Sequence, residues 1–329
     1  MRSKNIDATW FEYERYGDAD VLTRRTERLE PPTGDQVSVE VITTSINHTE
    51  VFLRNGNEPE WSVGPWPRRS GSDFAGIVTA RGPLSSSFPV GAEVIGHVPA
   101  GAHATHLNVS SAALVAKPRN VTWETAGALY LAGATALDVL DDLHIGAGDT
   151  VVVSAAAGGV GSMQVQLAKR LGARVIGTCG ERNFDYLRQL GIIPVRYGDD
   201  IVDRIRAVAR GPVTAYIDNF GKDGADTAAA LNVPTERYRS SLDRRDIELK
   251  LLEDDPAAIA HGTDLLGRLA EYAHVGAFRV LVSGLYPLDD ITAAYEDLAK
   301  LHSRGKVVLA TRPVTTYRGL RARDVHEAT

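Results

Sequence analysis

A run of small residues, Ser154 to Gly161, stands between an apolar β-branched stretch and a segment whose apolar residues have helical spacing. Within it, Ala155, Gly158 and Gly161 form AxxGxxG, a variant of the GxGxxG turn. Small residues at these positions let the backbone approach a pyrophosphate, and the first N–H groups of the following helix bind its negative charge. Glycine-rich turns also end ordinary strands, but here the flanking strand and helix are both evident. The pattern therefore predicts a bound dinucleotide.

The end of the next strand, 173–178, distinguishes NAD from NADP. An NAD site places Asp or Glu there, about 20 residues beyond the turn, to bind the ribose 2′-hydroxyl. This chain has no acid between Gly177 and Gly180; Glu181 and Arg182 follow, and Tyr197 lies at the end of the third expected strand. A missing carboxylate and an available guanidinium favour a 2′-phosphate, so NADPH is the predicted cofactor. The alternative for Arg182 is a solvated residue at a helix start.

The composition is that of an ordinary globular protein, and 329 residues suffice for two domains. The net charge of −6 argues against nucleic acid or an anionic membrane as the main partner. Cys179 is the single cysteine, which excludes an internal disulfide or a multi-cysteine zinc site and fits a reducing compartment. No stretch approaches the about 20 apolar residues of a membrane span, and the first residues lack the apolar core of a signal peptide. We therefore expect a cytoplasmic protein.

Two patterns follow each other along the chain. Up to about residue 117, short alternating segments between glycine turns predict an antiparallel β domain, with a hairpin over 7–30, strands over 36–45, 71–78, 90–96 and 101–109, and a short helix over 46–56. From Thr122, which opens a helix together with Thr125, strands and helices alternate at the lengths of βαβ units. These are helices over 129–140, 265–273 and 288–301, and strands over 151–153, 173–178, 194–197, 213–218, 279–282 and 305–309. The charged segment 232–262 receives no element, and the segment 317–329 is expected to be loosely held.

Six motifs occur in order: INHTEVFLRNG (46–56), GSDFAGIV (71–78), LAGATAL (131–137), GAGDTVVVSAAAGGVG (146–161), YPLDDITAAYEDL (286–298) and RGKVVL (304–309). Together they resemble the medium-chain dehydrogenase/reductase superfamily, and within it the zinc-independent, ζ-crystallin-like quinone oxidoreductases. The resemblance implies an α/β fold. A GroES-like antiparallel β catalytic domain (1–123 and 280–329) would surround a doubly wound, parallel-sheet Rossmann domain that binds NADPH (124–279). Such enzymes are often homodimers that pair at the edges of their Rossmann sheets.

The resemblance also implies roles for single residues. Asn47 would lie near the nicotinamide and the substrate carbonyl, and Lys306 would contact the cofactor. Other residues would line the cofactor (Thr135, Asn219, Phe220), hold its pyrophosphate (Ala157, Gly158, Gly159, Val160, Gly161) or meet its adenosine phosphate end (Arg182, Tyr197). The alternatives are a helix N-cap for Asn47 and an ordinary helix hydroxyl for Thr135.

The zinc ligands of the superfamily are replaced in this chain. Where zinc members begin their motif with Cys-His-Thr-Asp, residues 47–50 read Asn-His-Thr-Glu, and their Gly-His-Glu matches Gly-Ser-Asp at 71–73. An improvised site from His48, Asp73 and His97 is conceivable, but catalytic zinc needs three well-placed ligands and a water, which these spacings do not demand. The sequence therefore predicts no metal.

A hydride site without zinc suits an acceptor that needs little Lewis-acid assistance, such as a quinone or a double bond conjugated to a carbonyl. Hydride transfer to the β-carbon leaves an enolate, which Asn47 would stabilise as a hydrogen-bond donor. Related enoyl reductases often carry a tyrosine shortly after the short helix, where this chain has Glu58. His48 and Tyr130 are the candidates to replace this proton donor. Alternatively, His48 is a surface or packing residue, and Tyr130 is a local adaptation of the sequence.

Other polar and aromatic residues receive weaker assignments. His103 and His106 are expected to be structural residues of a β-strand, and Glu50 and Asp73 are candidate polar residues of the cleft. Trp61 and Trp66 would either cover an apolar substrate or cap the β domain.

Two further functions remain open at this stage. One is a reductase of secondary metabolism that acts on a specific bulky intermediate. The other is a protein that binds NADPH without catalysis. An intact phosphate-binding turn without an evident proton-donating residue would favour this alternative.

Overall fold

The computed structural model describes residues 6–57, 59, 64–222, 224–300 and 304–314. The chain divides into two compact units. Unit 1 contains residues 1–131, 250–275 and 281–329, and unit 2 contains residues 132–249 and 276–280. One unit contains a sheet rich in antiparallel strands, and the other contains a parallel sheet. This mixed α/β structure agrees with the expected GroES-like and Rossmann folds.

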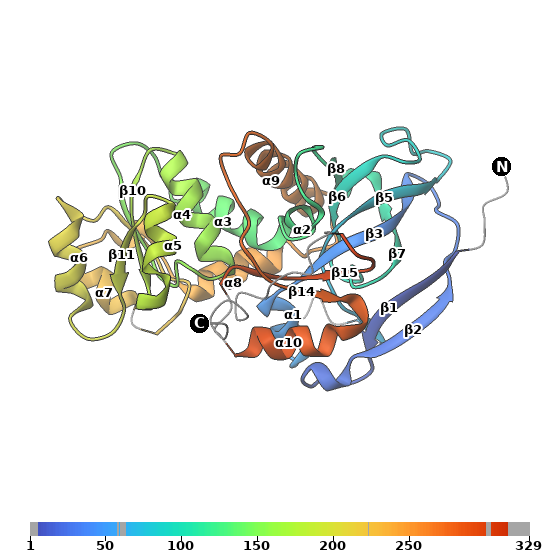
Figure 1. Cartoon of the computed structure of the whole chain (residues 1–329), viewed down its shortest axis with the longest axis horizontal. Coiled ribbons are helices and arrows are strands. Elements are labelled where there is room, and N and C mark those ends of the chain that lie inside the picture. The colour runs from blue at the N-terminus through green and yellow to red at the C-terminus, as the bar shows by residue number, and fades with distance from the viewer. Residues whose placement is uncertain (1–5, 58, 60–63, 223, 301–303, 315–329) are drawn as a thin grey trace. The chain divides into compact units, whose positions relative to one another are not determined.

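The largest sheet of unit 1 has seven strands, in the order β14-β15-β3-β5-β6-β8, with β7 also paired to β3. It is almost entirely antiparallel; only β14 and β15 run parallel. Val37, Val39 and Val41 alternate along β3 and are fully buried, which explains the alternation seen in the sequence. The strands are β3 (Gln36–Ile46), β5 (Asp73–Arg81), β6 (Glu93–His97), β7 (His106–Ser110), β8 (Leu114–Ala116), β14 (Val282–Pro287) and β15 (Lys306–Ala310) (Figure 1).

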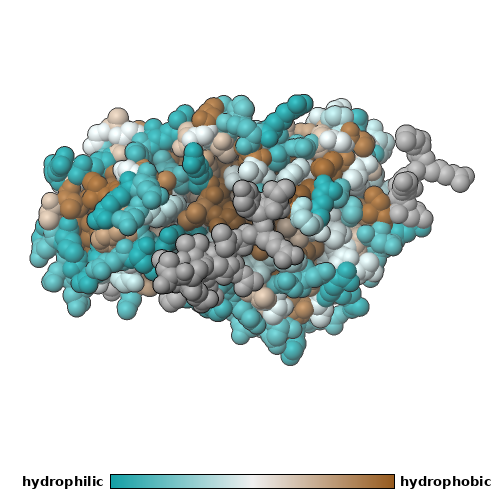
Figure 2. Space-filling model, viewed as in Figure 1, coloured by the Kyte–Doolittle hydropathy of each residue, from teal (hydrophilic) through white to brown (hydrophobic). Residues whose placement is uncertain are grey.

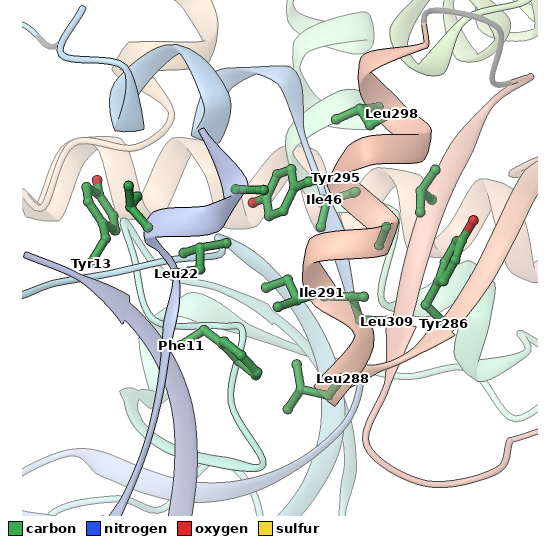
Figure 3. Close-up of a cluster of buried hydrophobic side chains, with 14 residues drawn as sticks. Phe11, Tyr13, Leu22, Ile46, Tyr286, Leu288, Ile291, Tyr295, Leu298 and Leu309 are labelled. Carbon is green, nitrogen blue, oxygen red and sulfur yellow. The ribbon is translucent and has the colours of Figure 1, made fainter. Parts of the chain in front are cut away.

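A second, three-stranded sheet in unit 1 joins the expected hairpin to a short third strand, in the order β2-β1-β4. Its strands are β1 (Asp7–Tyr13), β2 (Thr23–Arg28) and β4 (Arg68–Arg69). Beside it, the amphipathic helix α10 (Ile291–Ala299) buries Ile291, Ala294, Tyr295 and Leu298. These side chains form one apolar cluster with residues of β1, of the 3-10 helix Ala19–Val21 and of β15 (Figure 3).

Two short helices complete the part of unit 1 that precedes residue 131. Helix α1 (His48–Arg54) follows β3 directly, and α2 (Trp123–Ala126) begins after Thr122, whose hydroxyl accepts a hydrogen bond from the N–H of Thr125, as predicted. Short 3-10 helices also lie at Ser111–Ala113 and Leu288–Asp290.

Unit 2 is built on a five-stranded parallel sheet in the order β11-β10-β9-β12-β13. The first strand in sequence, β9, therefore lies in the middle, as in doubly wound folds. The strands are β9 (Thr150–Val153), β10 (Arg174–Cys179), β11 (Ile193–Arg196), β12 (Ala215–Ile217) and β13 (Tyr238–Arg239). The helices are α3 (Tyr130–Asp142), α4 (Gly159–Arg170), α5 (Phe184–Gln189), α6 (Ile201–Ala209), α7 (Gly224–Ala230) and α8 (Ser241–Lys250), with 3-10 turns at Glu181–Asn183 and Thr235–Arg237.

The segment that received no element from the sequence contains much regular structure. Besides β13 and α8, it includes the start of α9 (Pro256–His274), which begins nine residues earlier than the predicted helix over 265–273. Asp255 caps α9 by accepting from the N–H groups of Ala257 and Ala258, and Pro256 occupies its first position. Figure 1 shows α9 beside β6 and β8, against which it packs.

The strand predicted over 279–282 is wrong. Residues 278–281 have no regular structure, and β14 starts at Val282 and pairs with β15 in the sheet of unit 1. The apolar run Val280-Leu281-Val282 indicated a strand, but the hydrogen-bonding partner available to the chain begins opposite Val282.

The compact units do not coincide with the domain limits inferred from the resemblance. The boundary expected after residue 123 corresponds to a boundary between the compact units after Leu131. Residues 250–275, which were expected in the Rossmann domain, belong to unit 1. Packing of α9 on β6, β8 and the 3-10 helix Ser111–Ala113 accounts for this assignment. The domain limits at 123 and 280 remain a proposal.

On the face drawn in Figure 2, hydrophilic residues predominate and hydrophobic residues are exposed in smaller patches. Helix α6 illustrates the pattern, since it buries Ile205 and Ala209 and exposes Asp203 and Arg206. Among the described residues, no helix is long and apolar enough to cross a membrane.

The apolar cluster around α10 gives a test of the fold. Ile291 is 1% exposed, and its truncation to alanine should lower the free energy of unfolding by about 2–5 kcal/mol, because a cavity remains. Leu84→Ala is the matched control in the same unit, since Leu84 is 77% exposed and its truncation should change stability by less than about 0.5 kcal/mol. Urea unfolding of both variants measures this; equal losses would contradict the assigned core.

Candidate active site

The small-residue turn joins the central strand β9 to helix α4, as its sequence predicts. Ala155 has a positive φ of 46°, a conformation in which glycine is usual, and Gly158 is the N-cap of α4. A Cβ atom on Gly161 would lie 2.4 Å from the carbonyl oxygen of Ala155, so only glycine fits at that position. The first N–H groups of α4 have no acceptor within the helix. This backbone cradle fits a pyrophosphate.

A side-chain contact fixes the ends of the two neighbouring strands β9 and β12. The Ser154 hydroxyl donates to Asp218 Oδ1 at 2.7 Å and accepts from the N–H groups of Asn219 and Phe220. Asn219 donates from its amide to the carbonyl oxygen of Ser154 and to Gln164 Oε1. Its own Oδ1 atom is buried and, among the described residues, has no hydrogen-bond partner. Phe220 is 67% exposed. An unsatisfied polar atom and an exposed ring at this edge of the sheet fit a bound ligand.

The ends of β10 and β11 carry the groups predicted to distinguish NADP from NAD. Arg182 and Tyr197 are both exposed, and the ring of Tyr197 lies over Gly180, whose Cβ position is 3.6 Å from the tyrosine hydroxyl. Glu181 forms an exposed ion pair with Arg196 at 3.6 Å. Arg196 ends β11 opposite Cys179; the sequence analysis named its neighbour Tyr197 at the end of this strand but not Arg196.

The other predicted cofactor contacts are partly or fully buried. Thr135, in the second turn of α3, is fully buried, and Ala157 is 5% exposed. Gly158, Gly159 and Val160 are half-buried at the start of α4.

Unit 1 holds a buried polar network around Asn47. Asn47 is the N-cap of α1, and Glu50 completes a capping box in which the Asn47 N–H donates to Glu50 Oε2 at 2.9 Å. The buried ammonium of Lys306 donates to the amide oxygen of Asn47 and to the carbonyl oxygen of Ile46. Lysine has no acceptor atom, so this contact assigns the amide orientation: Nδ2 faces Glu50 Oε1 at 3.2 Å and Ser72 Oγ at 3.5 Å.

Asp73 lies in the same network and is 1% exposed. Its Oδ2 atom accepts from the Ser45 hydroxyl at 2.7 Å, and its Oδ1 atom accepts from the N–H of Leu131 at 3.2 Å. Lys306 Nζ is 3.9 Å from Oδ2. Burial raises the pKa of Asp73, the neighbouring Glu50 charge adds to the rise, and Lys306 opposes it.

His103 and Tyr295 border the network on the other side of Glu50. The Tyr295 hydroxyl donates to Glu50 Oε2 at 2.8 Å, and burial and this carboxylate raise the pKa of Tyr295 well above its usual range. His103 Nε2 lies 3.1 Å from the carbonyl oxygen of Ser45, which can only accept, so Nε2 carries the hydrogen and Nδ1 accepts from Ser70. Burial lowers the pKa of His103, which keeps this tautomer neutral.

Tyr130 has a different place from a solvent-facing proton donor. It is fully buried, its hydroxyl donates to the carbonyl oxygen of Leu251 at 2.7 Å, and its ring stacks on His97 at 4.0 Å. A Cβ atom on Gly262 would lie 2.4 Å from the Tyr130 hydroxyl. This geometry favours a role in holding residues 250–255 and α9.

The remaining candidates are scattered. His48 is exposed at the start of α1, whereas His106, in β7, is half-buried. The pKa of His106 is lowered by burial. Trp66 is 40% exposed and packs edge-on against Tyr13 and Tyr16. Glu58, Trp61 and the segment 317–329 lie outside the described residues. Among the described residues, no group of three or more His, Cys, Asp or Glu side chains is placed to hold a metal ion.

A cavity of about 640 Å³ opens within unit 1. Its wall includes Glu50, Ser70 and Gly71 on one side and the segment Leu252–Asp255 on another. Glu50 is therefore shared by the buried network and the cavity wall. Neither its burial nor its partners could be read from the sequence, where it stood as a weak candidate.

The two units thus define a dinucleotide-binding fold joined to a GroES-like fold. Residues 159–237 match the family model of the zinc-binding dehydrogenases, and residues 33–134 match that of the alcohol dehydrogenase GroES-like domain. The chain belongs to the medium-chain dehydrogenase/reductase superfamily.

Two relatives and one solved structure illustrate the range of the family. A probable mitochondrial zinc-binding oxidoreductase of Arthroderma benhamiae is 30% identical over 265 residues, which cover 73% of this chain and 78% of that protein. A mycocerosic acid synthase-like polyketide synthase of Mycobacterium tuberculosis is 31% identical over 280 residues, 83% of this chain but only 13% of the synthase. The Escherichia coli quinone oxidoreductase complexed with NADPH superposes with a TM-score of 0.78 at 23% identity, covering 92% of this chain and 99% of that one, a similarity that shows the fold.

The burial of His97 predicts a pH dependence of stability. Burial lowers its pKa from 6.5 to about 4, and its Nε2 donates to the Thr263 hydroxyl, which itself donates to Ala112. Below pH 6.5 the unfolded chain binds a proton that the folded chain binds only near pH 4. Stability is therefore full above pH 6.5 and falls as the pH drops toward 4, by up to about 3 kcal/mol.

His97→Phe keeps a ring against Tyr130 and removes this titration. Urea unfolding at several pH values should show a shallower loss of stability for the variant than for the unsubstituted protein between pH 6.5 and 4. Other buried histidines are present in both proteins and cancel in the comparison. Parallel pH profiles would show that His97 titrates normally.

Proposed function

We propose that this protein is a zinc-independent, NADPH-dependent oxidoreductase that reduces a quinone or an α,β-unsaturated carbonyl compound. The observation that carries the proposal is the Asn47 amide, which Lys306 holds with its NH₂ group directed away from the ammonium. Asn47 and Ser72 replace the Cys and His ligands of zinc members, so hydrogen bonding takes the place of a Lewis acid in this proposal.

When bound, NADPH supplies the hydride. The turn between β9 and α4 would hold its pyrophosphate with backbone N–H groups, and the exposed arginines 182 and 196 would bind the 2′-phosphate. Asn47 Nδ2 would exchange its long contact with Ser72 Oγ, 3.5 Å, for a hydrogen bond to the substrate oxygen, on which negative charge develops as the hydride arrives. Because Lys306 and Glu50 fix the amide before the reaction, little reorganisation accompanies this charge.

A pathway-specific reductase is the second candidate. The 31% identity to part of a polyketide synthase favours reduction of a double bond in a bound acyl intermediate. A third candidate, a non-catalytic NADPH-binding protein, shares the cofactor site but requires no substrate cavity. We also propose a cytoplasmic homodimer, as the family resemblance implies; size-exclusion chromatography with light scattering tests its oligomeric state.

A substrate panel tests the activity. Oxidation of NADPH, followed by nicotinamide absorbance, should depend on a quinone, an alkenal, an enone or an enoyl thioester, and should be slower with NADH. Turnover of quinones alone selects the quinone reductase, and turnover of an enoyl thioester selects the pathway reductase. Tight NADPH binding with no turnover would support the non-catalytic candidate, and no binding of either cofactor would refute the proposal.

The preference for NADPH should depend on the two exposed arginines. Arg182→Ala and Arg196→Ala should each raise the KM for NADPH by about tenfold or more and leave that for NADH nearly unchanged, because a hydrogen bond to a charged group contributes about 1.5–3 kcal/mol. Arg188→Ala is the control, since Arg188 is an exposed arginine of α5 that pairs with Asp185. Equal effects on both cofactors would exclude 2′-phosphate recognition.

The oriented amide gives a further prediction. Asn47→Ala should lower kcat by about 10²–10³-fold, the usual effect of losing one such donor. Lys306→Met should have a similar effect, and the double variant should be little worse than either single one, because Lys306 acts through Asn47. Lys300→Met, at an exposed position, serves as control. If the losses of kcat in the two single variants add up in the double variant, the two residues act independently.

A further inference from the structure

Ser72 lies between two buried carboxyl groups. Its Oγ atom is 3.2 Å from Glu50 Oε1 and 3.1 Å from Asp73 Oδ1, and the three residues are 1%, 7% and 1% exposed in the order Ser72, Glu50, Asp73. A hydroxyl has one hydrogen and can donate it to only one of the two carboxyl oxygens. Both contacts are hydrogen bonds only if one carboxyl group carries a proton.

The surrounding donors indicate which carboxyl group is protonated. Glu50 accepts from the Asn47 N–H, the Asn47 amide and the Tyr295 hydroxyl, a set that favours the ionised carboxylate. Asp73 has fewer donors and is the more deeply buried, and its pKa is raised by burial and by the Glu50 charge. The proton therefore belongs on Asp73, which donates to Ser72, which in turn donates to Glu50.

The charged and titratable groups of the neighbouring elements act on this proton in both directions: the Glu50 charge favours it on Asp73, and the Lys306 charge opposes it. Lys306 of β15 faces Asp73 Oδ2 at 3.9 Å, and the guanidinium of Arg54, from α1, lies 4.4 Å from the Tyr295 ring centroid. His103 Nε2 is 3.8 Å from Glu50 Oε2, but burial keeps His103 neutral. Tyr295 of α10 donates to Glu50 and is itself held protonated by burial.

One end of this chain of hydrogen bonds reaches the cavity of unit 1. Glu50 lines the cavity together with Ser70 and Gly71, whereas Ser72 and Asp73 do not line it. A proton that moves from Asp73 through Ser72 arrives at the one member of the chain that forms part of the cavity wall.

We propose that Asp73, Ser72 and Glu50 form a proton-delivery path that supplies the cavity with the proton needed after hydride transfer to a carbon–carbon double bond. This inference rests on the proposed function and selects, among its substrates, those whose reduction requires protonation at carbon. A quinone differs, because its reduced oxygen atoms exchange protons with water directly.

The steps balance as follows. The Asp73 O–H bond breaks as its proton moves to Ser72 Oγ, and the Ser72 proton moves to Glu50 Oε1. The neutral Glu50 then transfers this proton to the α-carbon of the substrate enolate, whose electron pair forms the new C–H bond. Both carboxyl groups are then ionised, with Asp73 facing the Lys306 ammonium, and a proton from water restores the starting state.

The shared proton can be measured without cofactor or substrate. Infrared spectra of the full chain at neutral pH should contain the C=O stretch of a protonated carboxyl group, which is absent from a carboxylate. Asp73→Asn should remove this band, and it should still fold, because asparagine keeps the side-chain shape and is neutral, as the protonated Asp73 is. Glu50→Gln should shift the loss of the band to lower pH, and Glu27→Gln, at an exposed position of β2, should leave it unchanged. A neutral-pH spectrum in which Asp73→Asn changes nothing would overturn the path.

The delivery step is tested by the ratio of enone to quinone turnover. Glu50→Gln and Ser72→Ala should each lower this ratio by about a hundredfold, the usual contribution of general acid catalysis, and should increase the solvent isotope effect on enone reduction. A purely structural role would reduce both activities together and leave the ratio unchanged, which would refute delivery. If the unsubstituted protein oxidises NADPH neither in the presence of the enone nor in the presence of the quinone, the proposed function is refuted, whatever the infrared result.

Discussion

The buried ammonium of Lys306 is the interaction on which the organisation of unit 1 depends. Lys306 lies in β15, and its ammonium donates to Ile46, the last residue of β3, and to Asn47, the residue before α1. It also faces Asp73, the first residue of β5. Burying a charge is costly unless it is paired and hydrogen-bonded, and this cation has acceptors on the consecutive residues Ile46 and Asn47 and a carboxyl group, Asp73, from a separate strand. The arrangement brings the two carboxyl groups and Asn47 into one network and leaves the amide with a single orientation.

Unit 2 solves a different physical problem, that of holding negative charge with backbone groups. Ala155 tolerates a left-handed conformation, and Gly161 allows α4 to approach the turn. Ser154 and Asp218 then fix the ends of the two strands beside this turn. A rigid turn of this kind binds anions with few side chains, which is why its residue types are small and its signature is legible in sequence.

Features that depend on neighbours in sequence were predictable, and those that depend on distant partners were not. The turn after β9, the cap at Thr122 and the alternation in β3 were predicted because each is a local pattern. The hydrogen bonds between Lys306 and Asn47 and between Tyr295 and Glu50 join segments that are far apart in the chain. No local sequence pattern predicts them. Glu50 and Asp73 were predicted as polar residues of the cleft, but nothing in their spacing indicates that Ser72 lies between their carboxyl groups. Helix α9 did have a local signal, Asp255 followed by Pro256, that the charged surroundings obscured.

The close contact between Tyr130 and Gly262 has a consequence for the evolution of this sequence. The tyrosine hydroxyl occupies the space that a side chain at 262 would need, and it donates a hydrogen bond to the carbonyl oxygen of Leu251, directly after α8. A chain with a larger residue at 262 cannot keep this tyrosine in place, and a chain without the tyrosine has no need of glycine there. The two positions should therefore change together among close relatives, which makes their joint identity a marker for sequences that share this way of anchoring α9.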